Sequence, residues 1–394
     1  MQNTPGFVAT LLALTLSCTQ AAGAVSASQM TLGDIVDVAV LRQQQPGGGI
    51  PYQASSWLAT SPSLGVSYLD SDESNGTDET ELSLNLPFKS GYAREVDREL
   101  RALSEDITAA EQLRRRLYYS GLIRETLWAM RLANTREGYA RKKVELLEGL
   151  VARQQTLYSA RASSRYGLLL VRQELSQSKA EQQAFAWEAS NWLNQYSRIS
   201  GQNLAPADIA ESPPPTELDY AQHPDVRLLN LNWQRQQRLI AAGSAKTSPV
   251  NVALSAKRLD NRQLNENQYG VAVDIPLTVF DIASESTRSE WQQASRDYWQ
   301  LHDELQLDLK RNWEKLQAEK EHLQERQALL DDTVATSADL LSETRMLFKL
   351  NEIPYEFWMR RILGDIDSQS DAAINRLLIE QNKARIRQTA GIPL

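Results

Sequence analysis

The chain has 394 residues, with 42 lysines and arginines against 50 aspartates and glutamates, and a formal net charge of −8. An acidic chain without an extended basic cluster is a poor nucleic-acid binder, so no nucleic-acid partner is expected. The one cysteine, Cys18, and the three scattered histidines match no metal-ligand pattern, and the sequence contains no phosphate loop or nucleophile motif. The composition therefore does not indicate an enzyme, and we expect no cofactor, metal or catalytic residue.

Residues 1–24 are predicted to be a secretory signal peptide. They carry no charge, contain an apolar run over residues 7–16 and end in small residues, although the usual basic start is missing. Cys18 leaves open a second interpretation, in which it becomes the acylated first residue of a lipoprotein. After this segment no apolar run is long enough to span a membrane as a helix, so a membrane could be entered only through strands.

The first predicted repeat covers residues 25–201 and opens with a short amphipathic helix within residues 30–45. Thr31 can cap this helix, and Pro46 followed by three glycines would end it. Its apolar residues at helical spacing are Leu32, Ile35, Val36, Ala39 and Val40.

The second predicted repeat covers residues 223–394, and its first helix is expected over residues 226–242. His223 stands before Pro224 at the start of this helix, where a capping or packing role is favoured over metal ligation. The segment that precedes the first hairpin is much shorter than its counterpart in the second repeat, where this helix lies.

Two β-hairpins are predicted, over residues 62–88 and 249–277. Each follows a Thr-Ser-Pro and ends in a run in which apolar residues alternate with other residues. The apolar positions of the two runs are Leu82, Leu84 and Leu86 in the first, and Val271, Val273 and Ile275 in the second. The polar residues at matching places are Asn85 and Asp274. Two copies of one unit indicate an internal repeat.

The two copies differ in phase by one residue after Pro62 and Pro249. The first apolar strand residue is Leu64 in one copy and Val250 in the other. Because successive strand side chains point to opposite faces, we expect a bulge or a gap in one copy.

Very long helices follow both hairpins. Residues 93–157 and 284–347 contain no proline and are rich in helix-forming residues. Shorter helices are expected to return over residues 165–200 and 355–389, and the proline-rich segment 202–222 would link the repeats. A soluble coiled coil would explain such helices but leaves the two alternating hairpins unexplained.

The doubled order of helix, hairpin, long helix, turn and returning helix resembles the TolC family of outer-membrane efflux proteins. The matching motifs are Thr31-Leu32, Asp34-Ile35 and Ala39, His223-Pro224-Asp225, Leu86-Pro87-Phe88 with its twin Ile275-Pro276-Leu277, and the turn from Phe348 to Pro354. Together they extend over nearly the whole chain after the signal segment.

This resemblance implies an α+β membrane protein made of two structural repeats. Each repeat would contribute one β-hairpin to a trimeric, 12-stranded outer-membrane barrel and long helices to a periplasmic α-helical barrel. Elementary physics supports the assembly, because a sheet in lipid must close on itself and four strands are too few to close. The lipid-facing residues would be Leu82, Leu84, Leu86, Val271, Val273 and Ile275, and the lumen-facing residues would be Asn85 and Asp274.

The resemblance also implies partners: a homotrimer in outer-membrane lipid, a periplasmic adaptor (membrane fusion) protein, and an inner-membrane transporter of the RND type. The adaptor is expected to dock at the two turns that end the long helices. The residues expected there are Tyr158, Ala160, Arg161, Ser163, Phe348, Asn351, Ile353 and Pro354, with Ile353 and Pro354 forming an exposed apolar turn.

Two departures from the family pattern concern these turns. The glycine that relatives often carry is replaced by Arg161 in one turn and Asn351 in the other. Phe357 and Arg360 stand where relatives carry the aspartates of the periplasmic gate, so that gate chemistry cannot be transferred. The nearby carboxylates are taken as ordinary surface charges; they are Glu356, Asp365 and Asp367. The shortened first segment further implies that one rod of the helical barrel is incomplete.

The function expected from this resemblance is an exit duct of a tripartite efflux system. Two alternatives stay open: a duct for type I protein secretion, and a periplasmic coiled-coil scaffold without a pore. The transported substrate cannot be predicted from the sequence.

Overall fold

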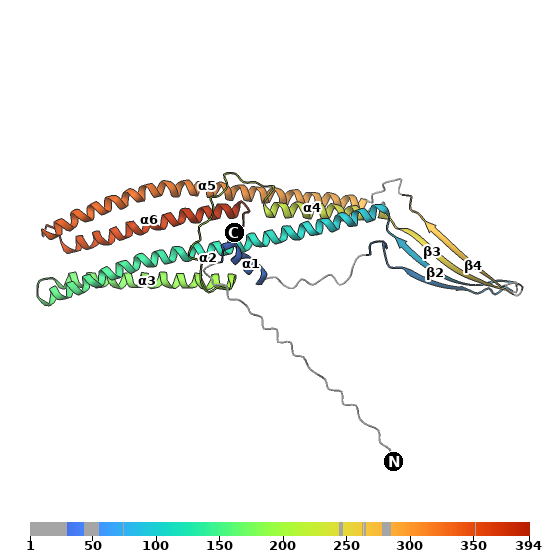
Figure 1. Cartoon of the computed structure of the whole chain (residues 1–394), viewed down its shortest axis with the longest axis horizontal. Coiled ribbons are helices and arrows are strands. Elements are labelled where there is room, and N and C mark those ends of the chain that lie inside the picture. The colour runs from blue at the N-terminus through green and yellow to red at the C-terminus, as the bar shows by residue number, and fades with distance from the viewer. Residues whose placement is uncertain are drawn as a thin grey trace, which may run out of the picture.

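The protein is elongated in the computed structural model, with a strand sheet at one end and two helical turns at the other (Figure 1). The structure describes residues 30–42, 55–73, 75–243, 247–261, 263, 265–277, 285–350 and 352–394. The signal segment 1–24 with Cys18, the stop after Pro46 and the turn residue Asn351 lie outside the described residues.

The described elements occur in the order helix, hairpin, long helix and returning helix, and this order is repeated once. In the first repeat they are α1 (Leu32–Arg42), β1 (Ser63–Leu69), β2 (Asp78–Phe88), α2 (Gly91–Ser159) and α3 (Arg165–Ser200). In the second they are α4 (Pro224–Ala242), β3 (Val250–Asp260), β4 (Asn265–Asp274), α5 (Glu285–Lys349) and α6 (Tyr355–Thr389). The helices α2 and α5 have 69 and 65 residues, which corresponds to about 100 Å of helix each.

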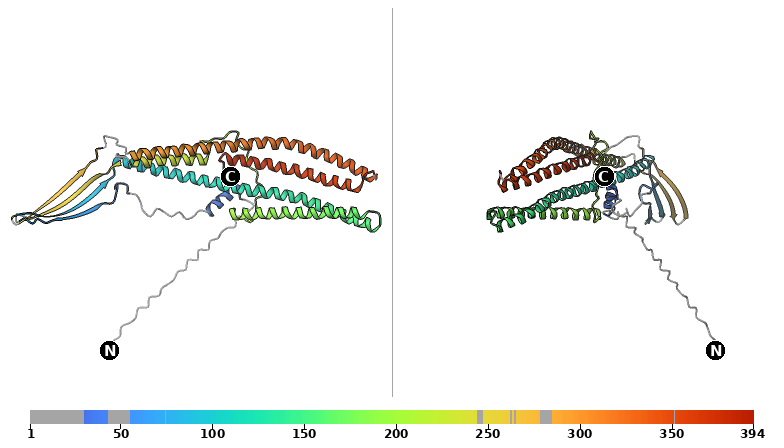
Figure 2. Two further views of the ribbon diagram at one scale, coloured as in Figure 1. Left: turned by 180° about the vertical axis from the view of Figure 1, so that it is seen from behind. Right: turned by 60° about the vertical axis from the view of Figure 1, so that its left-hand side comes forward.

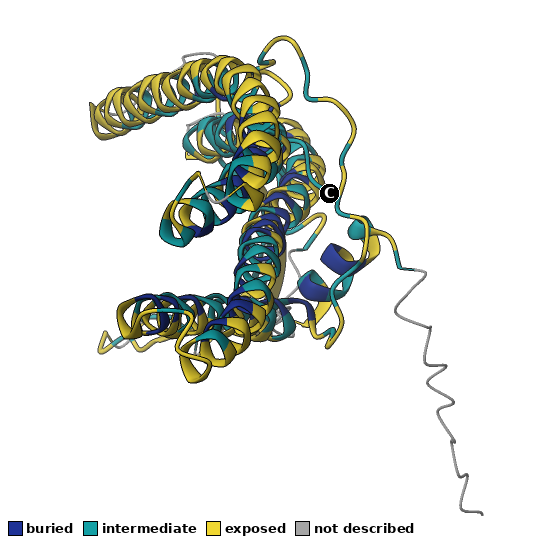
Figure 3. Cartoon of the chain, turned by 90° about the vertical axis from the view of Figure 1, so that its left-hand side faces the viewer, coloured by how far each residue is buried: buried dark blue, intermediate teal, exposed yellow. Residues whose placement is uncertain are grey.

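Two antiparallel helical pairs, α2 with α3 and α5 with α6, form the helical body, and α6 also packs on α2. Both views in Figure 2 show these pairs running away from the sheet. Viewed along the helices, buried residues gather on their inner sides and exposed residues on the outside (Figure 3). Near the turns the two pairs share one apolar cluster, in which Met359 of α6 meets Leu147 and Leu150 of α2 and Val171 of α3.

The two repeats end alike. Gly201 after α3 and Gly391 after α6 both have a φ of 76°, and this left-handed conformation favours glycine. Gly391 also leaves room for its neighbour, since a Cβ atom there would lie 2.8 Å from the ring of His223. The equal ends of the two returning helices support a duplicated architecture.

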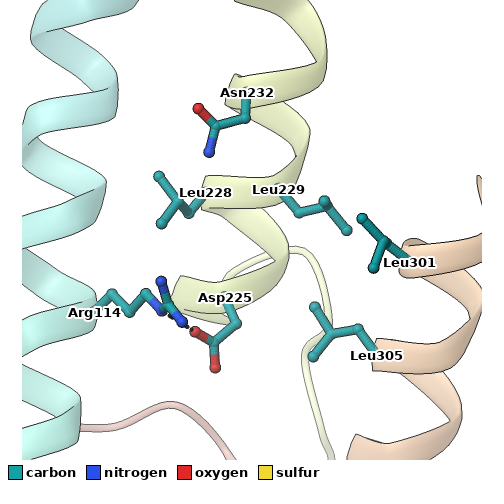
Figure 4. A pocket seen from close by; sticks show the side chains of 7 residues that line it. All are labelled: Arg114, Asp225, Leu228, Leu229, Asn232, Leu301 and Leu305. Atoms are coloured by element: carbon teal, nitrogen blue, oxygen red, sulfur yellow. Dashed lines mark hydrogen bonds and ion pairs between the residues drawn. The ribbon is translucent and has the colours of Figure 1, made fainter. Parts of the chain in front are cut away.

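Helix α4 lies between α2 and α5 (Figure 4). His223 caps it, because its Nδ1 accepts a hydrogen bond from the amide of Asp225 at 3.3 Å. Burial lowers the pKa of His223, which favours the neutral ring that this cap requires. Asp225 also binds the guanidinium of Arg114, with 2.8 Å between Oδ1 and Nε. The predicted capping role of His223 is therefore confirmed.

The segment 202–222 crosses between the repeats and is fixed by a buried carboxylate. Glu211 accepts two hydrogen bonds from Arg124 of α2, at 2.8 and 2.5 Å, and one from Arg387 of α6 at 3.0 Å. Its side chain is 8% exposed and that of Arg124 is 5% exposed. The crossing segment is thus tied to both helical pairs.

Helix α1 packs at the middle of the molecule. Thr31 and Asp34 form a capping box, with the Thr31 hydroxyl accepting from the Asp34 amide and the Thr31 amide donating to the Asp34 carboxylate. Its apolar face, with Ile35 and Val36, is buried against α2 and α3. Thr31 therefore caps this helix as predicted.

Buried polar side chains lie along the contact between α5 and α6. Asn375 and Asn382, seven residues apart, donate to the carbonyl oxygens of Leu323 and Leu316 at 2.9 and 3.2 Å. Asp365 is 7% exposed, and one of its oxygens accepts from Gln369 at 2.9 Å. The expectation that Asp365 is a surface charge is wrong, because α6 packs on two neighbours and little of its surface stays in solvent.

None of the helices in the described ranges is both long enough and apolar enough to cross a membrane.

Candidate functional site: the strand sheet and the helical turns

The four strands form one antiparallel sheet in the order β1-β2-β3-β4. Leu84 pairs with Leu64 of β1 on one side and with Leu254 of β3 on the other, and Leu254 pairs with Val271 of β4. Because directly opposed residues point to the same face, most large apolar residues of the four strands share one face, whereas Leu69 and Leu259 pair with Glu79 on the other. The members of the apolar face are Leu64, Val66, Tyr68, Leu82, Leu84, Leu86, Phe88, Val250, Val252, Leu254, Tyr269, Val271 and Val273.

The opposite face is polar and small. Asn85 pairs with Ser63 and Ala253, and Asp274 pairs with Asn251. This face also carries Ser67, Glu79, Glu81, Ser83, Ser255, Lys257, Glu266, Gln268 and Gly270. The residues named as lipid-facing and those named as lumen-facing thus lie on opposite faces of one sheet, apart from Ile275, which follows the last residue of β4. What each face contacts stays a prediction.

Much of the apolar face is open to solvent in the single chain. Val66 is 72% exposed, Val271 is 72% exposed and Val273 is 53% exposed. Exposed apolar surface of this extent is unusual for a soluble monomer and normally marks an interaction surface. Both edge strands, β1 and β4, are exposed along their whole length, and an uncovered edge strand offers unpaired backbone groups to another strand.

The irregularity expected from the phase difference lies in the first copy. Leu58 pairs with Phe88 in an isolated bridge, and regular pairing starts only at Ser63 opposite Asn85. Four residues of one segment therefore oppose two residues of β2, which is a larger interruption than a single-residue bulge. Between β3 and β4 the register continues without interruption.

The junction of β2 and α2 is held by polar contacts. Ser90 caps α2 by accepting a hydrogen bond from the Ala93 amide at 3.2 Å. Lys89 donates to the carbonyl of Ser55 at 2.7 Å and pairs with Asp97. The ring of Trp57 contacts that of Phe88, with centroids 5.5 Å apart. These contacts fix how the sheet meets the helical body.

The turn between α2 and α3 is closed by backbone hydrogen bonds. The amide of Ala162 donates to the carbonyl of Leu157 at 2.8 Å, and Arg161 has a φ of 58°. This is a Schellman-type end, in which the left-handed residue is usually glycine. Tyr158, Ala160 and Arg161 are exposed, and Ser163 is half-buried and donates to Gln154 at 2.8 Å.

The turn between α5 and α6 closes in the same way, with the amide of Glu352 donating to the carbonyl of Leu347 at 3.0 Å. Pro354 is exposed and stands at the N-terminal cap of α6. Phe348 is half-buried because its ring stacks on Trp358 at a centroid distance of 4.9 Å. Ile353 is also half-buried, so the expectation that Ile353 is part of an exposed apolar turn is only partly correct.

Several exposed apolar residues near the turns are not among the docking residues predicted from the sequence. On the second turn Leu350 is 63% exposed and Phe357 is 58% exposed. On the first turn Tyr166 is 61% exposed and Leu169 is 50% exposed. The helical spacing of these side chains, outside the buried stripe of each helix, is the signal that could have identified them.

In the part of the chain that the structure describes, no group of three histidine, cysteine, aspartate or glutamate side chains is placed to hold a metal ion.

The fold is similar to that of several solved outer-membrane proteins. The outer membrane channel CmeC of Campylobacter jejuni has a TM-score of 0.64 and 12% identity, covering 91% of this chain and 85% of that chain. The outer membrane protein VceC of Vibrio cholerae has a TM-score of 0.62 and 11% identity, covering 84% and 86%. CusC, described with its transmembrane channel formation, has a TM-score of 0.62 and 12% identity, covering 84% and 82%.

No family model matches the sequence. No curated protein matches it either. The similarity therefore lies in the fold, which is that of the TolC-like outer-membrane channels: long paired helices with a small antiparallel sheet at one end.

Proposed function

We propose that this protein is the outer-membrane exit duct of a tripartite efflux system. The observation that carries the proposal is the sheet, which has a band of apolar side chains across all four strands on one face, a mainly polar opposite face and two uncovered edges. A sheet of this kind is suited to lipid on one side and water on the other. The similarity in fold to outer-membrane channels supports the same interpretation.

The lengths of the strands fit a bilayer. A membrane strand needs roughly 9 to 11 residues, and β2, β3 and β4 have 11, 11 and 10 residues. The strand β1 has 7 residues, but its partner β2 gains one further pair at Leu58. Leu82, Leu84, Leu86, Val271, Val273 and Ile275 would face lipid, and Asn85 and Asp274 would face the water-filled lumen.

Closing the barrel requires more than one copy. The edge strand β4 of one copy would pair with β1 of the next, and three copies of four strands would form a 12-stranded barrel. The long helices of the three copies would then form the wall of a periplasmic tunnel. A homotrimer is therefore part of the proposal.

The expected partners follow from the position of the two helical turns. The turns lie at the far end of helices about 100 Å long, and at that distance from the sheet the duct could reach a protein of the inner membrane. We infer that a periplasmic adaptor docks there, through Tyr158, Ala160, Arg161, Ser163, Phe348, Asn351, Ile353 and Pro354, and connects the duct to an inner-membrane transporter of the RND type. The exposed side chains of Leu350 and Phe357 enlarge this surface.

Cell fractionation followed by size analysis tests the proposal. The protein should be recovered with the outer membrane and should run as a trimer in mild detergent. Recovery as a soluble periplasmic monomer would contradict the proposal, because the apolar face of the sheet would then be exposed to water.

A further inference from the structure

A basic pocket lies where the sheet joins α2. It has a volume of about 500 Å³ and is lined by Ser55, Ser56, Arg94, Asp97, Arg98, Leu100 and Arg101. The three arginines follow one another at spacings of four and three residues, so they share one side of the helix. All three are exposed.

The carboxylates around these arginines are largely engaged elsewhere. Asp97 pairs with Lys89, and Glu99 pairs with Arg238 at 3.0 Å. Glu95 lies one turn before Arg98, and Glu105 lies one turn beyond Arg101, but neither carboxylate lines the pocket.

The positions of the three arginines are unfavourable in two respects. Like charges one turn apart repel, and cations in the first turns of a helix oppose the positive end of its dipole. The first turn of α2 contains no acidic residue that would offset this. An anion bound between the arginines would relieve both effects, and guanidinium groups bind phosphate oxygens in a bidentate manner.

The pocket lies where the segment before β1 approaches the start of α2. Its lining comes from Ser55 and Ser56, which precede β1, and from the first turns of α2. Arg94, Arg98 and Arg101 are exposed there, so a ligand can reach all three guanidinium groups.

The depth of the pocket points to the source of the anion. If the sheet spans the outer membrane, Arg94 lies about 5 Å and Arg101 about 15 Å beyond the start of α2. Long arginine side chains can reach back from this depth to the headgroup layer. Trp57, next to Ser56, contacts Phe88 on the apolar face of the sheet, so acyl chains could follow that face.

We propose that Arg94, Arg98 and Arg101, together with Ser55 and Ser56, bind the phosphate group of an anionic phospholipid in the inner leaflet of the outer membrane. This inference rests on the proposed function, because it needs the sheet to lie in that membrane. Basic pockets beside membrane-spanning segments commonly bind anionic headgroups.

The test measures lipid binding to the full chain purified in nonionic detergent, by native mass spectrometry. The probes are dioleoyl phosphatidylglycerol, dioleoyl phosphatidylcholine and inorganic phosphate. The variant R94Q/R98Q/R101Q removes the three charges. The matched control R198Q/R326Q/R345Q removes three exposed arginines outside the pocket.

The wild type and the control should bind phosphatidylglycerol at least about tenfold more tightly than phosphatidylcholine, and the triple variant should lose this preference. If the triple variant prefers phosphatidylglycerol as strongly as the wild type does, the proposal is overturned. So would binding of inorganic phosphate as tight as that of the lipid, since the site would then serve a free anion. A wild type without any preference overturns it whether or not the variant folds.

The result can be separated from the proposed function. The triple variant should still fractionate with the outer membrane and run as a trimer, because its changes spare the apolar face and the strand edges. If it fractionates normally but keeps the lipid preference, only the lipid site is wrong. If the wild type is not in the outer membrane, the proposed function itself fails. Loss of the trimer in the triple variant alone would mean that the arginines pair with a second copy, which also overturns the lipid site.

Discussion

Arg161 holds the turn between α2 and α3 in a left-handed conformation, with a φ of 58°. A residue with a Cβ atom pays roughly 1 kcal/mol or more for this conformation, whereas glycine does not. Arg161→Gly should therefore stabilise the protein by about 1 kcal/mol and raise the midpoint of thermal unfolding in detergent. Ala162→Gly is the control, because Ala162 has an ordinary negative φ. An equal effect of both changes would show that the turn is not strained at Arg161.

The two faces of the sheet can be compared at neighbouring residues. Val273 and Asp274 are both exposed on β4 and point to opposite faces. Val273→Arg should prevent membrane assembly, because a charge facing lipid near the middle of the bilayer costs about 2 to 4 kcal/mol. Asp274→Arg should assemble and change only conductance. Outer-membrane yield and channel recording measure the two outcomes, and equal tolerance of both changes would mean that the faces are assigned wrongly.

At the level of residues, the alternation of apolar and polar residues predicts which face of the sheet a side chain occupies. The alternation through Leu82 and Leu84 correctly predicts that the apolar side chains share one face of the sheet. The burial of Asp365 and the partial burial of Ile353 could not be predicted. The burial of Asp365 depends on how α6 packs against α2 and α5, and no local pattern in α6 records those neighbours.

Among the elements, the crossing segment 202–222 depends on Glu211, which lies between Arg124 and Arg387. Glu211→Gln would leave two largely buried guanidinium groups without a counter-charge, and loss of one partner of a buried ion pair costs about 3 kcal/mol or more. We expect a lower unfolding midpoint and faster proteolysis within the segment. Glu217→Gln, at an exposed site of the same segment, should behave like the wild type; an equal loss there would exclude the ion pairs as the cause.

The helical turns allow a separate prediction about docking. Ala160→Glu and Leu350→Glu place a charge on exposed sites of the two turns, so they should abolish efflux while the trimer and membrane insertion persist. Ala335→Glu, at an exposed site on α5 away from the turn, is the control. Cysteine cross-linking from Ser163 or Glu352 to the adaptor provides a direct readout. Failure of both sites to cross-link in an active complex would rule out docking at the turns.

The long helices can be predicted from the sequence, whereas the pocket at the start of α2 cannot. Proline-free helix-forming runs predict the long helices well, because propensity adds up over many residues. The sequence also shows that the segment before β1 is short. It does not show that Arg94, Arg98 and Arg101 line a pocket with Ser55 and Ser56, because this depends on how the residues before β1 pack against α2.

At the scale of the whole molecule, the single chain is incomplete in a defined way. One face of its sheet is apolar and exposed, and the edges β1 and β4 have no strand beside them among the described residues. Association of three copies would cover both edges, and insertion into lipid would cover the apolar face. Neither step alone would cover both the edges and the apolar face. We therefore expect trimer assembly and membrane insertion to depend on each other.

The most direct measurement is electron cryomicroscopy of the purified full chain in lipid nanodiscs. The account predicts three copies around one axis, with β4 of each copy paired to β1 of the next, a closed barrel of 12 strands within the lipid disc, and a helical tunnel extending about 100 Å from it. A single copy, an open sheet, or strands lying outside the lipid would contradict the proposed duct.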